Sequence, residues 1–196
     1  MNLVIFTSQV SPYHNARFVG ATKHFDKLHV VSTVNAGDFP EFLAKSLGEY
    51  SLHRLFDGHE AYAAAAFSGG VSQSVRDILA RLQPDAIAAA GWTAPESLAA
   101  LEYGRKNHVP TVVMSESQVD DAPRSFIREA VKKRVVSQFD AALVGGPPHA
   151  AYAAHLGIPH DCIQFGYNAV DNAYFEREAH LARAGTEKLR KRLGLP

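Results

Sequence analysis

Side chains that could bind a polar ligand gather just after the first apolar run of the chain, residues 3–6. They are Tyr13, His14, Asn15 and Arg17. Two rings and a cation in one short loop could hold a ligand, but the loop could equally lie at the surface, with Ser11 or Asn15 capping the next helix. The G-x-G-x-x-G fingerprint is absent here, which argues against a dinucleotide pyrophosphate at this position.

Further candidates follow the fourth and fifth apolar runs, residues 86–90 and 111–114. Trp92, the only tryptophan, could stack on a sugar ring, or it could cover the end of a sheet by packing alone. Glu116, with Ser117 next to it, could accept hydrogen bonds from ligand hydroxyls, or its carboxylate could pair with an arginine. Both interpretations stay open for each of these positions.

A basic stripe is expected on the helix that follows these loops. Arg124, Arg128 and Lys132 are spaced at i, i+4 and i+8, which places them on one helical face. Such a stripe is typical of a solvated face, and it could also contact anionic lipid or the phosphate of a substrate. Arg128 is the residue of the stripe that we take as a site candidate.

The remaining titratable residues form no recognisable metal motif. The 10 histidines include no H-E-x-x-H pair, and Asp120 and Asp121 do not make a D-x-D motif. A G-x-S-x-G elbow for hydrolysis is also absent. We therefore expect neither a metal nor a bound cofactor.

Positioning these residues requires a regular scaffold, and the chain has short apolar runs suited to one. They lie at residues 3–6, 28–32, 52–56, 86–90, 111–114, 141–144 and 162–165. Most are apolar throughout instead of alternating, as expected of parallel strands that are covered on both faces. Each run is predicted to be a strand.

Helical patterns fill the gaps between the runs. Val71, Val75, Ile78, Leu79 and Leu82 have helical spacing, and the pattern ends at Pro84. Thr93 and Glu96 fit a capping box at the start of a helix that runs to about Asn107. Strand and helix alternate, which predicts an α/β fold: a doubly wound, Rossmann-like parallel sheet of about seven strands. Ligands bind at the carboxyl ends of such strands, so loops 7–17, 91–95, 115–123 and 145–148 should share one edge.

Composition narrows the class of protein. The 196 residues carry 20 Lys and Arg against 20 Asp and Glu, so no basic surplus favours nucleic acid. One cysteine, Cys162, excludes an internal disulfide framework and suits a reducing cytoplasm. The N-terminus has no basic leader, and no apolar stretch approaches the length of a membrane span. We predict a cytoplasmic protein, whose contact with the inner face of a membrane would be peripheral.

The second half of the chain contains Arg128, Glu129, Lys132, Ile163 and the segments FDAALVGG at 139–146, YAAHLGIP at 152–159 and NAVDNAYF at 168–175. In these residues and segments it resembles family 4 (group 1) glycosyltransferases. The resemblance covers about half of the chain. It implies the GT-B architecture, in which two Rossmann-like domains face each other across a cleft.

The resemblance also implies a division of the chain. Residues 1–172 correspond to the N-terminal, acceptor-side domain, and residues 173–196 to a linker and a charged helix that lead toward a C-terminal, donor-binding domain. The acidic E-x₇-E pair of the family belongs to that second domain, and Glu41 and Glu49 match its spacing by chance. The catalytic acidic pair is therefore expected outside this chain.

The function that the resemblance implies is the acceptor-binding half of a retaining, metal-independent glycosyltransferase. Such an enzyme moves a sugar from a UDP- or GDP-sugar to a glycan or lipid acceptor, and this half alone should be inactive. The main alternative is a non-catalytic sugar-binding or partner subunit of a separate transferase chain. A sugar-nucleotide epimerase on the same two-domain plan is a third hypothesis.

Overall fold

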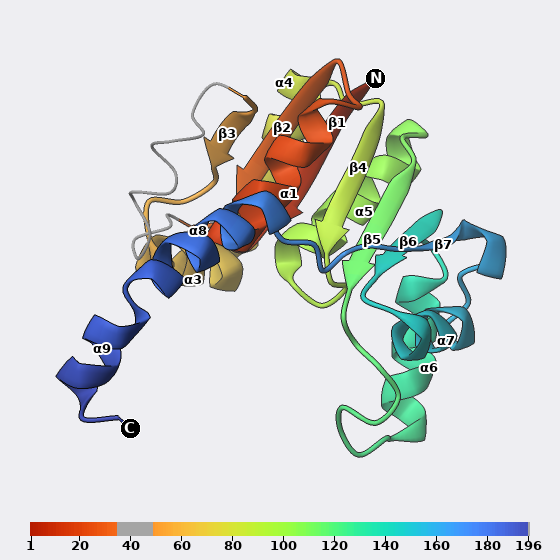
Figure 1. The fold of residues 1–196 in the computed structure, drawn as a ribbon. Coiled ribbons are helices and arrows are strands. Elements are labelled where there is room, and N and C mark those ends of the chain that lie inside the picture. Colours follow the sequence, from red (N-terminus) through yellow and green to blue (C-terminus); the bar gives the residue numbers. More distant parts are fainter. Residues whose placement is uncertain (35–48, 196) are drawn as a thin grey trace.

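The computed structural model describes residues 1–34 and 49–195, and its seven strands form one parallel sheet in the order β3-β2-β1-β4-β5-β6-β7 (Figure 1). The strands are β1 Asn2–Thr7, β2 Lys27–Ser32, β3 Ser51–Arg54, β4 Ala86–Ala90, β5 Thr111–Ser115, β6 Ala141–Val144 and β7 Ile163–Phe165. This confirms the predicted fold class. Glu41 lies outside the described residues.

Helices connect the strands. They are α1 Pro12–Thr22, α3 His59–Ser68, α4 Gly70–Leu82, α5 Pro95–Asn107, α6 Phe126–Val136, α7 Pro147–His155, the 3₁₀ helix η1 His160–Cys162, α8 Asn172–Ala184 and α9 Thr186–Leu193. The strand order reverses between β1 and β4, which are neighbours in the sheet. Because ligands of doubly wound sheets bind where the order reverses, the carboxyl ends of β1 and β4 mark the expected position of a site.

One face of the sheet packs against α4 and α5. Val4, Val31 and Ile87 of the strands are buried there together with Val75 and Leu79 of α4. The spacing that predicted α4 is thus the spacing of its buried side chains. Further along the same face, residues of β5 and β6 are buried against α5, α6 and α7.

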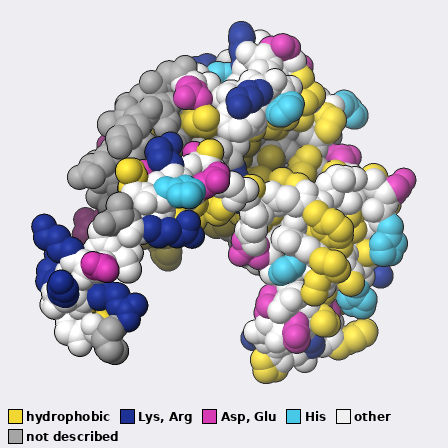
Figure 2. Space-filling view, viewed as in Figure 1, with side chains coloured by type: hydrophobic (Ala, Val, Ile, Leu, Met, Phe, Trp, Pro, Cys, Tyr) yellow, Lys and Arg dark blue, Asp and Glu magenta, His cyan; other side chains and the backbone are white. Residues whose placement is uncertain are grey.

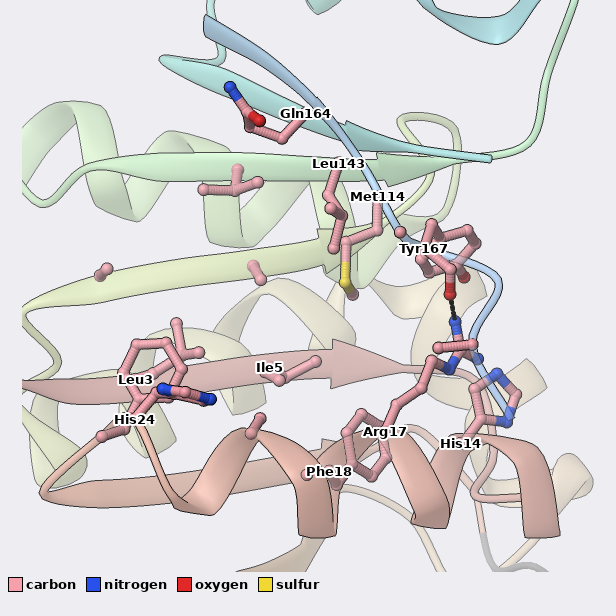
Figure 3. Close-up of a pocket in the computed structure, with 18 of the residues that line it drawn as sticks. Leu3, Ile5, His14, Arg17, Phe18, His24, Met114, Leu143, Gln164 and Tyr167 are labelled. Atoms are coloured by element: carbon pink, nitrogen blue, oxygen red, sulfur yellow. Dashed lines mark hydrogen bonds between the residues drawn. The ribbon is translucent and has the colours of Figure 1, made fainter. Parts of the chain in front are cut away.

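The opposite face of the sheet takes its helical cover from α1. Phe18 of α1 packs on Leu3, Ile5 and neighbouring apolar side chains. Beside α1 lies an apolar groove of about 740 Å³, whose floor includes Met114 and Leu143 (Figure 3). Figure 2 shows hydrophobic side chains in the hollow at this position.

The structure corrects three local predictions. The third strand is β3 at Ser51–Arg54, although the run was expected at 52–56. Arg124 precedes α6, which begins at Phe126, so the three basic residues do not form one helical stripe. Residues 173–196, expected to be a linker and one charged helix, instead contain two helices, α8 and α9, which are divided at Gly185. Lys and Arg side chains gather over α9 (Figure 2).

Two histidines form a hydrogen-bonded pair on the neighbouring strands β2 and β3. Nδ1 of His29 lies 3.1 Å from Nε2 of His53. Burial, followed by the charge of Lys27, lowers the pKa of His29. Burial, followed by His29 and Arg81 of α4, lowers the pKa of His53. The folded state therefore favours the neutral form of both rings.

We expect this pair to make the stability of the protein depend on pH. A histidine whose pKa is lowered by folding contributes stability above its unfolded pKa, about 6.5, and that contribution is lost as the pH falls below it. The urea midpoint should be flat from pH 8 to 7 and fall below pH 6.5. The double change His29→Gln and His53→Gln should make this fall shallower, whereas His59→Gln, at an exposed position, should not. Equal slopes for all three proteins would contradict the assignment.

Candidate functional site

A cavity of about 640 Å³ lies at the carboxyl edge of the sheet, where the strand order reverses, and we call it the edge cavity. It is lined by Ser11, Tyr13, His14, Arg17, Ala90, Gly91, Met114, Ser115, Glu116, Ser117, Tyr167 and Asn168. These residues come from the start of α1, from the ends of β4 and β5, and from the segment that precedes α8. Parallel strands bring these distant segments together because their carboxyl ends meet at one edge.

Gly91 allows the chain to leave β4 and form the wall of the cavity. Its φ of +74° lies in the left-handed region, which a residue with a Cβ rarely adopts. Its N–H donates to the carbonyl of Met114 at 2.8 Å, so β4 and β5 stay paired up to the edge.

His14 lies in the first turn of α1 and is bonded to the residue that caps this helix. Ser11 is the N-cap, and its hydroxyl lies 2.8 Å from Nδ1 of His14. Burial is the main cause that lowers the pKa of His14; the charge of Arg17 lowers it further, while Glu116 acts in the opposite direction. The ring is therefore neutral at pH 7.

Arg17 lies one turn further along α1 and joins this helix to the segment before α8. It donates through Nη1 to the carbonyl of Tyr167, 150 residues away in the sequence. Its guanidinium carbon is 4.6 Å from the centre of the Tyr167 ring, a cation–π distance. Figure 3 shows this contact beside His14. Arg17 thus places a permanent positive charge at the border of the cavity.

Five of the eight predicted site residues line the edge cavity: Tyr13, His14, Arg17, Glu116 and Ser117. Glu116 is exposed, and the backbone N–H of Ser117 donates to the hydroxyl of Ser115 at 3.1 Å. Asn15 accepts a hydrogen bond from the Tyr50 hydroxyl at 2.8 Å and does not line the cavity. Of the two residues that could cap the helix, Ser11 and Asn15, the structure shows Ser11 as the N-cap of α1.

Trp92 is placed in the core. Its side chain is 7% exposed, and its ring makes an edge contact with Tyr152, with centroids 6.3 Å apart. It belongs to the buried cluster between the sheet and α5 to α7, and it does not line the edge cavity. Its position therefore matches the packing interpretation of this residue.

Two of the three basic residues around α6 pair with the same carboxylate, that of Glu129. Arg124 and Lys132 both pair with Glu129, at 3.2 and 2.9 Å. The Tyr152 hydroxyl donates to the same carboxylate at 2.9 Å, and hydrogen bonds from Lys132 are the main cause that lowers the pKa of Glu129. Arg128 is exposed on α6 and does not line the edge cavity.

Glu96 is a buried carboxylate whose role the sequence pattern did not predict. The expected capping box with Thr93 is wrong: Ala94 is the N-cap of α5. The Glu96 carboxylate is 5% exposed in the chain and accepts hydrogen bonds from the hydroxyls of Thr33 and Tyr62, both at 3.0 Å. It therefore ties α5 to the end of β2 and to α3, next to the carboxyl edge.

Seven residues of the edge cavity were not among the candidates, and two of them, Tyr167 and Asn168, come from the segment before α8. Asn168 opens the N-x-V-D segment on which the resemblance rests, which is the sequence signal that could have identified it. Within residues 1–34 and 49–195, no three His, Cys, Asp or Glu side chains gather as metal ligands. In the same residues, no helix is long and apolar enough to cross a bilayer.

Comparisons with known proteins find this fold among solved structures. No family model and no curated protein matches the chain. HepE from Anabaena, in complex with UDP and glucose, matches with a TM-score of 0.67 at 14% identity, over 99% of this chain and 50% of HepE. UDP-N-acetylglucosamine 2-epimerase from Rickettsia bellii matches with a TM-score of 0.60 at 16% identity, over 100% of this chain and 52% of the epimerase.

A third match is UDP-GlcNAc 2-epimerase from Neisseria meningitidis, bound to UDP-GlcNAc, with a TM-score of 0.60 at 14% identity over 96% of this chain and 53% of that one. The chain spans about half the length of these proteins. At such identities the likeness shows the fold alone. The chain has the α/β, Rossmann-like fold of one half of a GT-B architecture.

Proposed function

We propose that the edge cavity binds a sugar, and that the chain is the acceptor-side half of a glycosyltransferase that uses a nucleotide-sugar donor. The observation that carries this proposal is the meeting of a neutral imidazole, a permanent cation and an exposed carboxylate in one cavity, at the point where the strand order reverses. His14, Arg17 and Glu116 provide these groups. The resemblance of the second half to family 4 glycosyltransferases points in the same direction.

The side chains of the cavity suit a sugar that lies beside a phosphoryl group. The Glu116 carboxylate can accept hydrogen bonds from two hydroxyls, which is how proteins recognise vicinal diols. Arg17 adds positive charge that would favour a nearby phosphoryl group. Tyr13 is 54% exposed and offers the flat face of its ring, with Phe175 of α8 stacked at 6.3 Å.

Transfer would need a second half to hold the nucleotide, because the chain covers only about half of each of the similar proteins. In this proposal the second half places positive charge at the leaving diphosphate, and this half orients the acceptor hydroxyl. The chain by itself should bind a sugar weakly and should not turn over a sugar nucleotide.

A second candidate is half of a sugar-nucleotide epimerase. The observation that favours it is that the two UDP-GlcNAc 2-epimerases from Rickettsia bellii and Neisseria meningitidis share the fold over 96–100% of this chain. A non-catalytic sugar-binding subunit would use the same cavity. The epimerase hypothesis differs from the other two in what the cavity recognises: half of an epimerase should require the nucleotide, whereas an acceptor-side half or a sugar-binding subunit should bind a free sugar better than UDP.

The test is an NMR titration of the ¹⁵N-labelled chain with glucose, UDP and UDP-glucose. Glucose should move the amide signals of Gly91, Ser117 and Asn168. Glu116→Ala should weaken binding about tenfold, since a hydrogen bond to a charged group contributes about 1.5–3 kcal/mol and 1.4 kcal/mol is tenfold. Glu116→Gln should cost less, because the amide oxygen still accepts.

Glu102→Gln is the matched control, because Glu102 is an exposed carboxylate on α5 away from the cavity. It should leave every affinity unchanged. Stronger binding of UDP than of glucose would overturn the acceptor-side assignment in favour of the epimerase. The absence of shifts around the cavity with all three probes would reject sugar binding at this site.

A further inference from the structure

The hydrogen bonds between Ser11 and His14 determine where the imidazole carries its proton. The backbone N–H of Ser11 donates to Nδ1 of His14 at 3.2 Å, and the Ser11 hydroxyl lies 2.8 Å from the same atom. A backbone N–H can only donate, so Nδ1 must be the unprotonated nitrogen of the ring. A neutral imidazole carries one proton, which then resides on Nε2.

The start of α1 keeps the ring in this state. Ser11 and His14 form a reciprocal capping box, in which the N–H of His14 also donates to the Ser11 hydroxyl at 3.4 Å. A proton on Nδ1 would face the Ser11 N–H and break the box. Arg17, on the same helix, and Glu116, on the loop after β5, are the charged groups that act on the ring. Burial and the charge of Arg17 favour the neutral ring, and together they outweigh the Glu116 carboxylate, which favours the protonated ring.

The Nε2–H is the part of this ring that remains free for a ligand. Within residues 1–34 and 49–195, no group accepts a hydrogen bond from it. His14 lines both the edge cavity and the adjoining apolar groove, where Figure 3 shows its ring beside Arg17. The ring thus presents a donor at the junction of the two hollows.

We infer that His14 is a fixed hydrogen-bond donor of the edge cavity, directed at an oxygen of the bound sugar or of a phosphoryl group, and that it is not the proton acceptor of the site. A general base needs a lone pair directed at the hydroxyl that it deprotonates. The lone pair of His14 is directed at Ser11, which leaves Glu116 as the carboxylate among the described lining residues that could act as a general base. The identity of the ligand in this inference rests on the proposed function, whereas the position of the proton on the His14 ring does not.

The first experiment measures the ring without any ligand. Two-dimensional NMR of the ¹⁵N-labelled imidazoles at pH 7.5 should show His14 almost entirely as the Nε2–H form. His59 should show the tautomer mixture of a solvated histidine. A proton on Nδ1 of His14, or a doubly protonated ring at this pH, would overturn the inference.

The second experiment separates the donor from the capping box. His14→Gln can keep both, because the amide oxygen can accept from Ser11 and the amide nitrogen can donate to the ligand. His14→Glu keeps the acceptor for the box but has no donor, and His14→Ala has neither. In titrations with glucose, UDP and UDP-glucose, the Gln variant should stay within about threefold of wild type and the other two should lose about tenfold.

The outcomes distinguish the two proposals. If the wild type binds and His14→Ala or His14→Glu binds equally well, the donor role is wrong while the sugar site stands. If the wild type binds none of the probes, the proposed function is wrong, and the ring measurement alone then decides the state of His14. If His14→Ala and His14→Glu bind UDP more weakly than wild type but bind glucose equally well, the acceptor of the Nε2–H bond is a phosphoryl oxygen. If they bind glucose more weakly but UDP equally well, the acceptor is a sugar hydroxyl.

Discussion

Trp92→Ala is expected to lower the free energy of unfolding by about 3–5 kcal/mol, the range for truncating a buried aromatic side chain to alanine. The indole is 7% exposed and packs edge-on against Tyr152, so its removal would leave a cavity between β4 and the helices on that face. The loss should appear in urea unfolding followed by circular dichroism. Affinity for glucose, measured on the folded fraction at low temperature, should stay unchanged.

Trp92→Phe is the matched variant, because it keeps an aromatic ring against Tyr152 while leaving a smaller void. It should cost less than half as much stability as Trp92→Ala. A Trp92→Ala protein that is as stable as wild type but binds glucose tenfold more weakly would show that the indole faces the ligand, against its position in the structure.

Glu96→Ala is the second large effect that we expect, about 3 kcal/mol of lost stability. The change removes two hydrogen bonds to a buried carboxylate and leaves the hydroxyls of Thr33 and Tyr62 without this acceptor. Hydrogen bonds to charged groups contribute about 1.5–3 kcal/mol, and an unsatisfied buried hydroxyl costs about 1–3 kcal/mol. Urea unfolding monitored by circular dichroism measures the loss.

Two variants of the same helix make this test specific. Glu96→Gln should fall between wild type and Glu96→Ala, because its amide oxygen still accepts from one hydroxyl. Glu102→Ala removes an exposed carboxylate from α5 and should change stability by less than about 0.5 kcal/mol. Equal losses for Glu96→Ala and Glu102→Ala would mean that only the charge or helix propensity of α5 matters.

Much of the fold could be predicted because its signals are local. The alanine-rich run at 86–90 is β4, and the apolar spacing of 71–82 is the buried face of α4. Parallel pairing followed from runs that are apolar throughout, since both faces of such strands are covered. The same local reasoning put the ligand loops at one edge, because all carboxyl ends of a parallel sheet share it.

Predictions from local spacing were wrong where a side chain bonds to a residue that the local pattern did not include. Glu96 has the spacing of a capping box with Thr93, yet its acceptors serve Thr33 and Tyr62, 63 and 34 residues away in the sequence. Arg124 has helical spacing with Lys132, yet it lies before α6 and pairs with Glu129. A carboxylate that is buried must accept hydrogen bonds that compensate for the loss of water. Sequence spacing does not reveal which strands and helices supply the donors.

Local sequence patterns predict the strands and helices of this chain, whereas packing between distant segments selects the side chains that reach the cavity. Asn15 and Arg17 are two positions apart on α1, but the helical turn directs one toward Tyr50 and the other toward Tyr167. Trp92 follows Gly91 directly, yet Gly91 lines the cavity and Trp92 is buried against Tyr152. Secondary structure follows from neighbours along the chain, whereas the direction of a side chain depends on packing against residues that only the folded sheet brings near.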